Sequence, residues 1–406
     1  RTGTVFYFML VYLGVLLFSM LFAREPGIAV GRVATYVIEG LLLFWLVVNV
    51  VRTERVLRRA IWTVVLAGAL LAGLSLYQAA AGAHRNQFAG LAQHETRMAY
   101  VVTDVPGEKP RLQLEVSERA GGPLGEPNRY AQILLVLVPI AAALMRRARS
   151  ITARVAAAAT LGLLLAGIVL TYSRGGLLTL ALLVLAGIYL RWVRPRQAVL
   201  GAVLMLVLVL AVAPGLGARL ASITGALDLV RDRPSAQADA AIRGRVTEML
   251  ASLNVFLEHP LVGVGPGQYL PVYSVDYQQS LTTKFRDLHK PRRAHNLYLE
   301  IAAETGILGI IAFLAIMATL ALQLRHARAC WAERDPEYSD LATAFLLALG
   351  VYLTSGLLLH LAFERYLWLM LALAAAMLHT RQPELAYYAP AVRRVPTLAE
   401  VHRGLV

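Results

Sequence analysis

Apolar runs of about 20 residues recur along the whole chain, and this pattern limits the possible folds more than any other feature. A helix of that length spans the roughly 30 Å hydrocarbon core of a bilayer, where lipid cannot satisfy an open backbone. Charged residues make up only 16% of the 406 residues, against about 25% in an average soluble protein. The sequence therefore predicts an all-α polytopic membrane protein and excludes an ordinary soluble enzyme, a disordered protein and a coiled coil.

Ten segments are predicted to be membrane spans. They cover residues 5–22, 33–51, 60–80, 130–144, 155–171, 177–190, 198–213, 307–324, 341–359 and 367–378. Arginines cluster after the second, fourth, sixth and eighth spans and again in the tail, whereas the short loops between these clusters contain few. Because basic loops stay in the cytoplasm, every second loop and the tail are predicted to be cytoplasmic.

This topology divides the chain into four parts. Residues 1–213 hold seven spans and a non-cytoplasmic loop at about 81–129, residues 214–306 form a large non-cytoplasmic loop domain, residues 307–378 hold three spans, and residues 379–406 form a cytoplasmic tail. A loop as long as the second one usually carries function or is disordered.

Local patterns predict structure inside the two long loops. In the first loop, alternating stretches at 98–103 and 111–116 flank Pro106-Gly107 and predict a small β-hairpin. In the second, apolar residues recur at helical spacing over 245–258, which predicts an amphipathic helix at the membrane surface that ends at His259-Pro260. The glycine-rich stretch 263–267 is neither a P-loop nor a dinucleotide fingerprint, so we interpret it as a turn.

The formal net charge of +14 is carried by 36 Arg and 3 Lys. In a soluble chain this balance would suggest a nucleic-acid partner, but here arginines at cytoplasmic helix ends and a site for an anionic lipid-linked substrate explain it, and no nucleic acid is expected. The single cysteine, Cys330, excludes an intramolecular disulfide framework. No group of His, Cys or Asp residues has metal-ligand spacing, so neither a metal nor another cofactor is expected.

Arg174 lies in the sequence Ser173-Arg174-Gly175-Gly176, between two spans joined by almost no loop. An arginine near membrane depth is unfavourable unless it meets an anion, a carboxylate or water, and the two glycines allow a sharp turn and the close approach of a ligand. Because arginines at span ends mostly cluster on the cytoplasmic side and this one does not, a functional role is favoured. The alternative is an arginine that snorkels to the interface.

A basic cluster closes the second long loop. Residues 284–295 contain five Lys or Arg residues, among them Lys290, Arg292 and Arg293, and only one acid. Such a cluster beside a membrane attracts phosphates or pyrophosphates, so these residues are predicted to bind substrate. Adhesion to anionic lipid head groups is the alternative.

His295 and Asn296 follow this cluster and open a helix that is predicted to run into the eighth span. The positive end of a helix dipole disfavours a charged imidazole, and a neutral imidazole can act as a general base. The alternative is a packing or capping histidine.

Arg243 and Arg245, at the start of the predicted surface helix, are further candidates for substrate binding and catalysis. Glu39, inside the second span, is either functional or simply paired with an arginine.

Several of these segments resemble a known family. His295-Asn296 followed by Gly306-Ile307-Leu308-Gly309 resembles the signature of bacterial O-antigen ligases (the WaaL type), which belong to the Wzy-C superfamily. The stretch from Arg245 to Gly265 is similar to the large-loop pattern of that superfamily. Ser173-Arg174-Gly175 resembles its earlier arginine motif, and Glu126-Pro127-Asn128 resembles its Pro-Asn element.

The resemblance implies that His295, Arg174 and Arg245 are catalytic. The implied reaction is the transfer of a polysaccharide from undecaprenyl pyrophosphate to a sugar hydroxyl of lipid A–core, a step of lipopolysaccharide biosynthesis. It would occur on the periplasmic face of the Gram-negative inner membrane, among membrane lipids and without metal or ATP. The family's fold is all-helical and GT-C-like, with about twelve spans, so two further spans are expected before Arg1.

The chemistry of the candidate residues agrees with this reaction. A sugar hydroxyl needs a base to take its proton, and a departing pyrophosphate gains negative charge that arginines stabilise in the transition state. Direct displacement would invert the anomeric centre. Two alternatives stay open. One is an O-antigen polymerase or protein O-oligosaccharyltransferase with the same chemistry. The other is a transporter of lipid-linked sugars, which would favour internal repeats and interrupted helices at the membrane midplane, and the sequence indicates neither.

Overall fold

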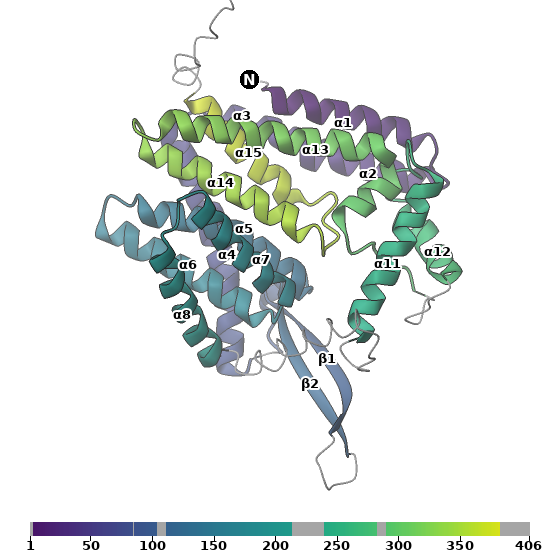
Figure 1. Cartoon of the computed structure of the whole chain (residues 1–406), viewed down its shortest axis with the longest axis horizontal. Coiled ribbons are helices and arrows are strands. Elements are labelled where there is room, and N and C mark those ends of the chain that lie inside the picture. The colour runs from purple at the N-terminus through teal and green to yellow at the C-terminus, as the bar shows by residue number, and fades with distance from the viewer. Residues whose placement is uncertain (1–2, 84, 104–110, 213–238, 282–289, 382–406) are drawn as a thin grey trace, which may run out of the picture.

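The computed structural model describes residues 3–83, 85–103, 111–212, 239–281 and 290–381, which are mostly helical (Figure 1). In chain order, the elements are α1 (Thr4–Met20), α2 (Pro26–Thr35), η1 (Tyr36–Leu42), α3 (Leu43–Val50), α4 (Glu54–Ala81), η2 (Phe88–Gly90), β1 (Gln93–Thr103), β2 (Arg111–Gly122), α5 (Pro127–Arg146), α6 (Ile151–Leu170), α7 (Arg174–Tyr189), α8 (Pro195–Val212), α11 (Asp239–Glu258), η4 (Tyr269–Tyr273), α12 (Ser274–Ser280), α13 (Leu297–Trp331), α14 (Pro336–Ser355) and α15 (Arg365–Thr380).

Every predicted span falls on a helix or on a continuous helical run. Six of these helices are long and apolar enough to cross a membrane, namely Pro26–Val50, Glu54–Ala81, Pro127–Arg146, Ile151–Leu170, Leu297–Trp331 and Pro336–Ser355. The other four predicted spans are shorter apolar helices, α1, α7, α8 and α15. The fold is therefore that of a mostly helical, polytopic membrane protein, and the count of ten spans stays a prediction.

The centre of the bundle is formed by α5 and α14, which are more buried than the other long helices. α5 packs against α6 and α14, and α13 packs against both α14 and α1. Figure 1 shows α13 beside α14, with α8 at the outer edge and α11 at the far side from α8. This arrangement brings the first residue of α13 and the last residues of α14 to the same end of the bundle, since Leu297 N–H donates to Gly356 O over 2.7 Å.

The predicted β-hairpin is confirmed. β1 and β2 pair antiparallel with Met98 opposite Val116 and Thr103 opposite Arg111, and Figure 1 shows the hairpin projecting away from the helices. Pro106-Gly107 lies outside the described residues. The described part of the second long loop contains α11, η4 and α12, whereas residues 213–238 and 282–289 of that loop and residues 382–406 of the predicted tail are not described.

α11 matches the predicted amphipathic helix but begins earlier, at Asp239, and it ends at Glu258 as predicted. Its outer face exposes the apolar side chains Val246, Leu250 and Leu257. Its inner face buries the polar side chains Thr247, Glu248 and Ser252. The apolar face is therefore free to meet lipid, and the polar face is turned toward the rest of the protein.

α13 is interrupted at Gly306, where the sequence predicted a continuous helix. The φ of 64° and ψ of −163° at Gly306 lie in a region that only glycine adopts readily. A Cβ atom there would lie 2.2 Å from Leu261 O, so the segment after α11 packs directly on the break. Backbone hydrogen bonds join the two segments, with Ile307 N–H donating to Pro260 O (2.8 Å) and Val264 N–H donating to Ala303 O (3.0 Å). These bonds fix α11 relative to the first turns of α13.

Candidate active site

His295 lies immediately before α13, in a conformation set by its neighbours. Its φ of 48° is left-handed, which is uncommon for a residue other than glycine but is tolerated by histidine better than by most. Asn296 is the N-cap, and its Oδ1 accepts hydrogen bonds from Tyr298 N–H (2.9 Å) and Leu299 N–H (3.0 Å). The Nδ2 of Asn296 donates to Leu357 O over 3.1 Å. Asn296 was predicted to bind substrate. The structure shows that the oxygen and the nitrogen of its side-chain amide hold the start of α13 beside the loop after α14.

A buried carboxylate from α11 faces His295. Glu248 is 1% exposed, and its Oε2 lies 3.4 Å from His295 Nε2. Its other oxygen, Oε1, lies 3.7 Å from Arg292 Nη1. A buried carboxylate is unfavourable unless charged groups compensate it, and here an imidazole and a guanidinium do so. The electrostatic surroundings of His295 therefore differ from the expectation, because the carboxylate stabilises an imidazolium that the helix dipole alone would disfavour.

Arg245 extends from the same face of α11 as Glu248, because residues three apart on a helix are neighbours. It lines a small cavity of about 20 Å³ together with Asn128, Ser173, Gly175 and Ser355. Ser173 and Gly175 flank Arg174 in sequence. The structure thus brings Arg245 to the loop that carries Arg174, and Glu248 links the same helix to His295.

Arg174 is the first residue of α7, and the preceding turn is fixed by hydrogen bonds. Ser173 caps the helix by accepting from Gly176 N–H over 3.1 Å, and Ser173 Oγ donates to Asn128 Oδ1 over 2.9 Å. The residue with a left-handed backbone here is Tyr172, with φ of 49°, and not one of the glycines. The glycines were expected to make the turn, but Gly176 instead permits close packing, since a Cβ would lie 3.1 Å from that of Ala131.

Arg119, at the end of the hairpin, joins these segments. Its side chain is buried, and its Nε donates to Thr171 O over 2.9 Å. Its Nη2 donates to Asn128 Oδ1 (3.1 Å) and its Nη1 pairs with Glu95 (3.3 Å). Arg119 thus fixes the turn before Arg174 to the N-terminus of α5. Sequence analysis missed this residue, which looked like one of many basic positions in a loop.

A second histidine lies beside His295. His360, in the loop between α14 and α15, places its ring 5.0 Å from that of His295 in an edge-on arrangement. Its Nε2 lies 3.6 Å from Glu126 Oε2. Glu126 in turn lies 3.8 Å from Arg129, which also pairs with Glu364. The site therefore contains two histidine–glutamate pairs side by side.

Two of these carboxyls have shifted pKa values of opposite direction. Burial acts to raise the pKa of Glu126, but a hydrogen bond from His360 and the positive charges of His360, Arg129 and His295 outweigh it, so the pKa is lowered. The pKa of Glu364 is raised because burial outweighs the attraction of Arg129. Glu126 therefore stays ionised to a lower pH than an ordinary glutamate.

The remaining predicted residues lie around this centre. Arg293 pairs with Glu300 at 3.4 Å, Lys290 is exposed, and Arg243 lies on α11 with a side chain outside the described part. Glu39 pairs with Arg365 at 2.6 Å, which confirms the simpler of its two interpretations. Among the residues described, no group of three or more His, Cys, Asp or Glu side chains could hold a metal ion.

In chemical terms, the site combines proton-accepting imidazoles with guanidinium groups and buried carboxylates at one end of the helical bundle. An imidazole held by a carboxylate is suited to take a proton from a hydroxyl. Guanidinium groups match the oxygens of a phosphate or pyrophosphate.

Residues 159–314 match the protein family Wzy_C, which is described as O-Antigen ligase. The matched segment runs from within α6 to within α13 and contains Arg174, Arg245, Glu248 and His295. Glu126 and His360 lie outside it. No curated protein matches the chain.

Proposed function

This chain belongs to the O-antigen ligase superfamily through its residues 159–314, and we propose that it transfers a polysaccharide from undecaprenyl pyrophosphate to a sugar hydroxyl of lipid A–core. The reaction would need no metal and no nucleotide, because the energy for transfer is held in the lipid–pyrophosphate linkage. It would take place on the periplasmic face of the Gram-negative inner membrane, in a GT-C-like helical fold.

One observation carries the proposal: α11 links all three predicted catalytic residues at one end of the bundle. Glu248 lies 3.4 Å from His295, and Arg245, one helical turn away, shares a cavity with the residues that flank Arg174. These three residues are far apart along the chain and belong to different elements, since Arg174 begins α7, Arg245 lies on α11 and His295 precedes α13. Their convergence supports a site for an anionic substrate that reacts with a hydroxyl.

The proposed step is a single displacement at the anomeric carbon. The acceptor hydroxyl oxygen forms a bond to that carbon while the bond to the pyrophosphate oxygen breaks, and the hydroxyl proton passes to His295. The pyrophosphate leaves with the electron pair of the broken bond, and the anomeric configuration inverts. Glu248 is the positioning residue, because its carboxylate orients the imidazole and stabilises the imidazolium that forms.

Arg174 and Arg245 would stabilise the negative charge that grows on the pyrophosphate. Such an interaction accelerates the reaction only if it is stronger in the transition state than in the ground state. A guanidinium stays charged and binds two oxygens at once, so it suits this role better than an ammonium. Arg292 and Arg293, together with the neighbouring Lys290 and with Arg243 of α11, would attract the substrate. Arg292 and Arg293 also pair with buried glutamates.

The test is a reconstituted transfer assay in which a new glycosidic bond is detected by mass spectrometry. His295→Ala should lower the rate by about 10²–10⁴-fold, the usual contribution of a general base. His326→Ala is the matched control, because His326 is an exposed histidine near the C-terminal end of α13, whereas His295 precedes its N-terminal end. Activity that survives in His295→Ala would remove the proposed base.

The acceptor decides between related functions. Lipid A–core, a second lipid-linked glycan and an acceptor protein are supplied in separate reactions, and the proposal expects product only with lipid A–core. Product with a lipid-linked glycan would indicate a polymerase, and product with the protein would indicate an O-oligosaccharyltransferase. Movement of the lipid-linked sugar across the bilayer without any new bond would indicate a transporter.

A further inference from the structure

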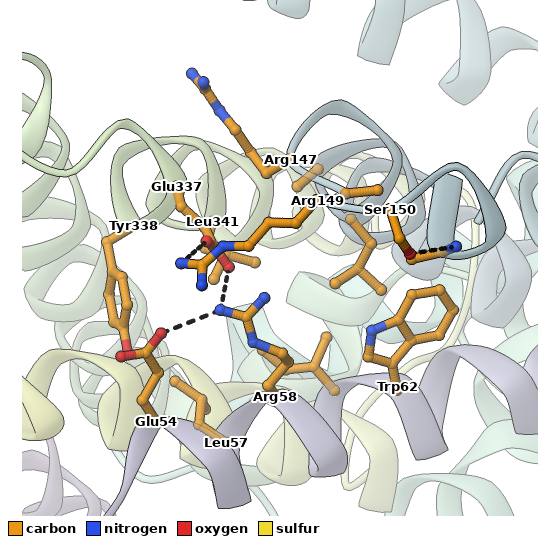
Figure 2. A pocket seen from close by; sticks show the side chains of 15 residues that line it. Glu54, Leu57, Arg58, Trp62, Arg147, Arg149, Ser150, Glu337, Tyr338 and Leu341 are labelled. Atoms are coloured by element: carbon orange, nitrogen blue, oxygen red, sulfur yellow. Dashed lines mark hydrogen bonds and ion pairs between the residues drawn. The ribbon is translucent and has the colours of Figure 1, made fainter. Parts of the chain in front are cut away.

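A second hollow region lies at the end of the bundle opposite to the candidate active site. It is formed where α4 begins, where α5 ends and where α14 begins, and Figure 2 shows its lining. The other ends of α5 and α14 reach the candidate active site through Asn128 and Ser355. The two regions are therefore separated by the length of these helices.

The deeper part is a cavity of about 210 Å³ with apolar walls that include Leu57, Ile61 and Leu341. It adjoins a larger hollow of about 900 Å³, because Arg58, Trp62 and other residues line both. The larger hollow also includes Leu66, an exposed side chain further along α4. An apolar surface thus leads from the cavity along α4.

The rim of this hollow is basic. Four arginines line the larger part: Arg55, Arg58, Arg59 and Arg149. Glu337 lies between two of them, at 2.6 Å from Arg58 and 3.5 Å from Arg149, and Arg58 also pairs with Glu54 at 3.0 Å. Figure 2 shows Arg58 and Arg149 converging on Glu337, whereas Arg147 points away. Two carboxylates face four guanidinium groups, so positive charge remains in excess.

A helix N-terminus adds to this charge. Ser150 caps α6 by accepting from Ala153 N–H over 3.1 Å, and both Ser150 and Arg149 line the cavity. The first N–H groups of a helix favour an anion. Trp62, on the α4 side of the hollow, is a residue type enriched at the membrane–water interface.

We propose that this hollow binds the phosphate head group of an anionic phospholipid, with an acyl chain lying along α4. The arginine rim and the α6 N-terminus suit a phosphodiester, and basic pockets between membrane helices are known to bind such head groups. The apolar walls favour a lipid over a soluble phosphate, which has no chain to place there. The bound lipid would join α4, α6 and α14 on the side away from the active site, independently of the reaction catalysed there.

The experiment uses the full chain in phosphatidylcholine nanodiscs that contain a small fraction of photoactivatable phosphatidylglycerol. We expect crosslinks in the first two turns of α4 and in the segment between α5 and α6. Unlabelled phosphatidylglycerol should compete at least about tenfold better than phosphatidylcholine, since each arginine near a lipid surface contributes about a fivefold preference for anionic lipid.

The variant R55Q/R59Q/R149Q should lose at least about tenfold in crosslinking yield. The control R194Q/R196Q/R325Q removes the same charge from exposed arginines outside the hollow and should retain the yield. Equal loss in both variants, equal competition by phosphatidylcholine, or crosslinks elsewhere would overturn the proposal. Displacement by soluble glycerol phosphate would do the same, because it would indicate a free phosphate as ligand. The lipid competition uses the unmodified chain, so it decides the question even if the variant is unstable.

Discussion

The two ends of the helical bundle use arginine in different ways. At the candidate active site, Arg292 and Arg293 pair with glutamates that are buried, Glu248 and Glu300. At the opposite end, Arg58 pairs with Glu54, whose side chain is 42% exposed, and with Glu337, whose side chain is 19% exposed, while Arg55 and Arg59 beside them are exposed. A buried carboxylate that loses its partner is strongly destabilising, whereas an exposed ion pair contributes little. The arginines of the candidate active site are therefore held in specific positions, whereas the exposed Arg55 and Arg59 at the opposite end are accessible to the lipid that we propose there.

After the loss of His295, the largest effect should come from removing an active-site arginine. Arg174→Ala and Arg245→Ala should each lose about 2–4 kcal/mol of transition-state stabilisation, roughly a 30- to 1,000-fold fall in kcat/KM, as for the loss of one oxyanion donor. Arg174→Lys should recover only part of the rate, because an ammonium lacks the planar fork. Steady-state kinetics of the transfer reaction measure this.

The matched control is Arg194→Ala, which removes an exposed arginine from the loop between α7 and α8, beyond the end of α7 that is far from Arg174. It should leave the kinetics unchanged. If Arg194→Ala and Arg245→Ala reduced the rate equally, the two ends would not differ in function and the comparison above would fail.

The next effect concerns Glu248, which acts through His295. Glu248→Gln should lower kcat by roughly 10- to 100-fold, the range for removing a group that orients a functional histidine. The acidic limb of the pH–rate profile should also move to lower pH, because the imidazolium loses a neighbouring negative charge. A merely structural glutamate would lower the amount of folded protein and leave the profile in place, and that outcome would contradict the assigned role.

Structural elements that depend only on the spacing of residues within one segment were predicted well from the sequence. The apolar segments, the hairpin and the surface helix α11 each follow from the spacing of side chains within one element, and the structure has all of them. His259-Pro260 after α11 correctly predicted where this helix ends. These features needed no knowledge of tertiary contacts.

Pairings between distant segments were not predicted. Nothing in the sequence indicates that Glu248 meets His295, or that Glu126 meets His360, because each pair joins two different elements. One signal for Glu248 was present, since it lies one turn after Arg245 on the polar side of an otherwise apolar helix. His360 had no such signal, because its loop has no regular period.

A smaller effect is expected from the break in α13. Gly306→Ala would place a Cβ 2.2 Å from Leu261 O in a backbone conformation suited to glycine alone, and it should lower stability by at least about 1–3 kcal/mol. Gly162→Ala is the control, because a Cβ there meets nothing within 4 Å and α6 is helical at this point. Thermal unfolding in detergent should separate the two variants, and equal midpoints would show that the break does not hold α11 against α13.

The smallest effect is a pH dependence of stability at the active-site end. The lowered pKa of Glu126 means that its contribution to stability is present above its ordinary value of 4.5 and is lost as the pH falls through the lower value of the folded state. Glu126→Gln should therefore flatten the acid side of the thermal-unfolding profile, where the pH falls below 4.5.

Glu364→Gln should change the profile in the opposite sense, since burial raises the pKa of Glu364 and its charged form opposes folding as the pH rises through 4.5. Unfolding midpoints of the unmodified chain and both variants, measured over the same pH series, give two difference curves. Opposite slopes are expected because positive charge around Glu126 outweighs its burial, whereas around Glu364 it does not. Slopes of the same sign would mean that the two histidine–glutamate pairs do not hold Glu126 in its ionised form, and the distinction between the two ends of the bundle would then rest on the arginines alone.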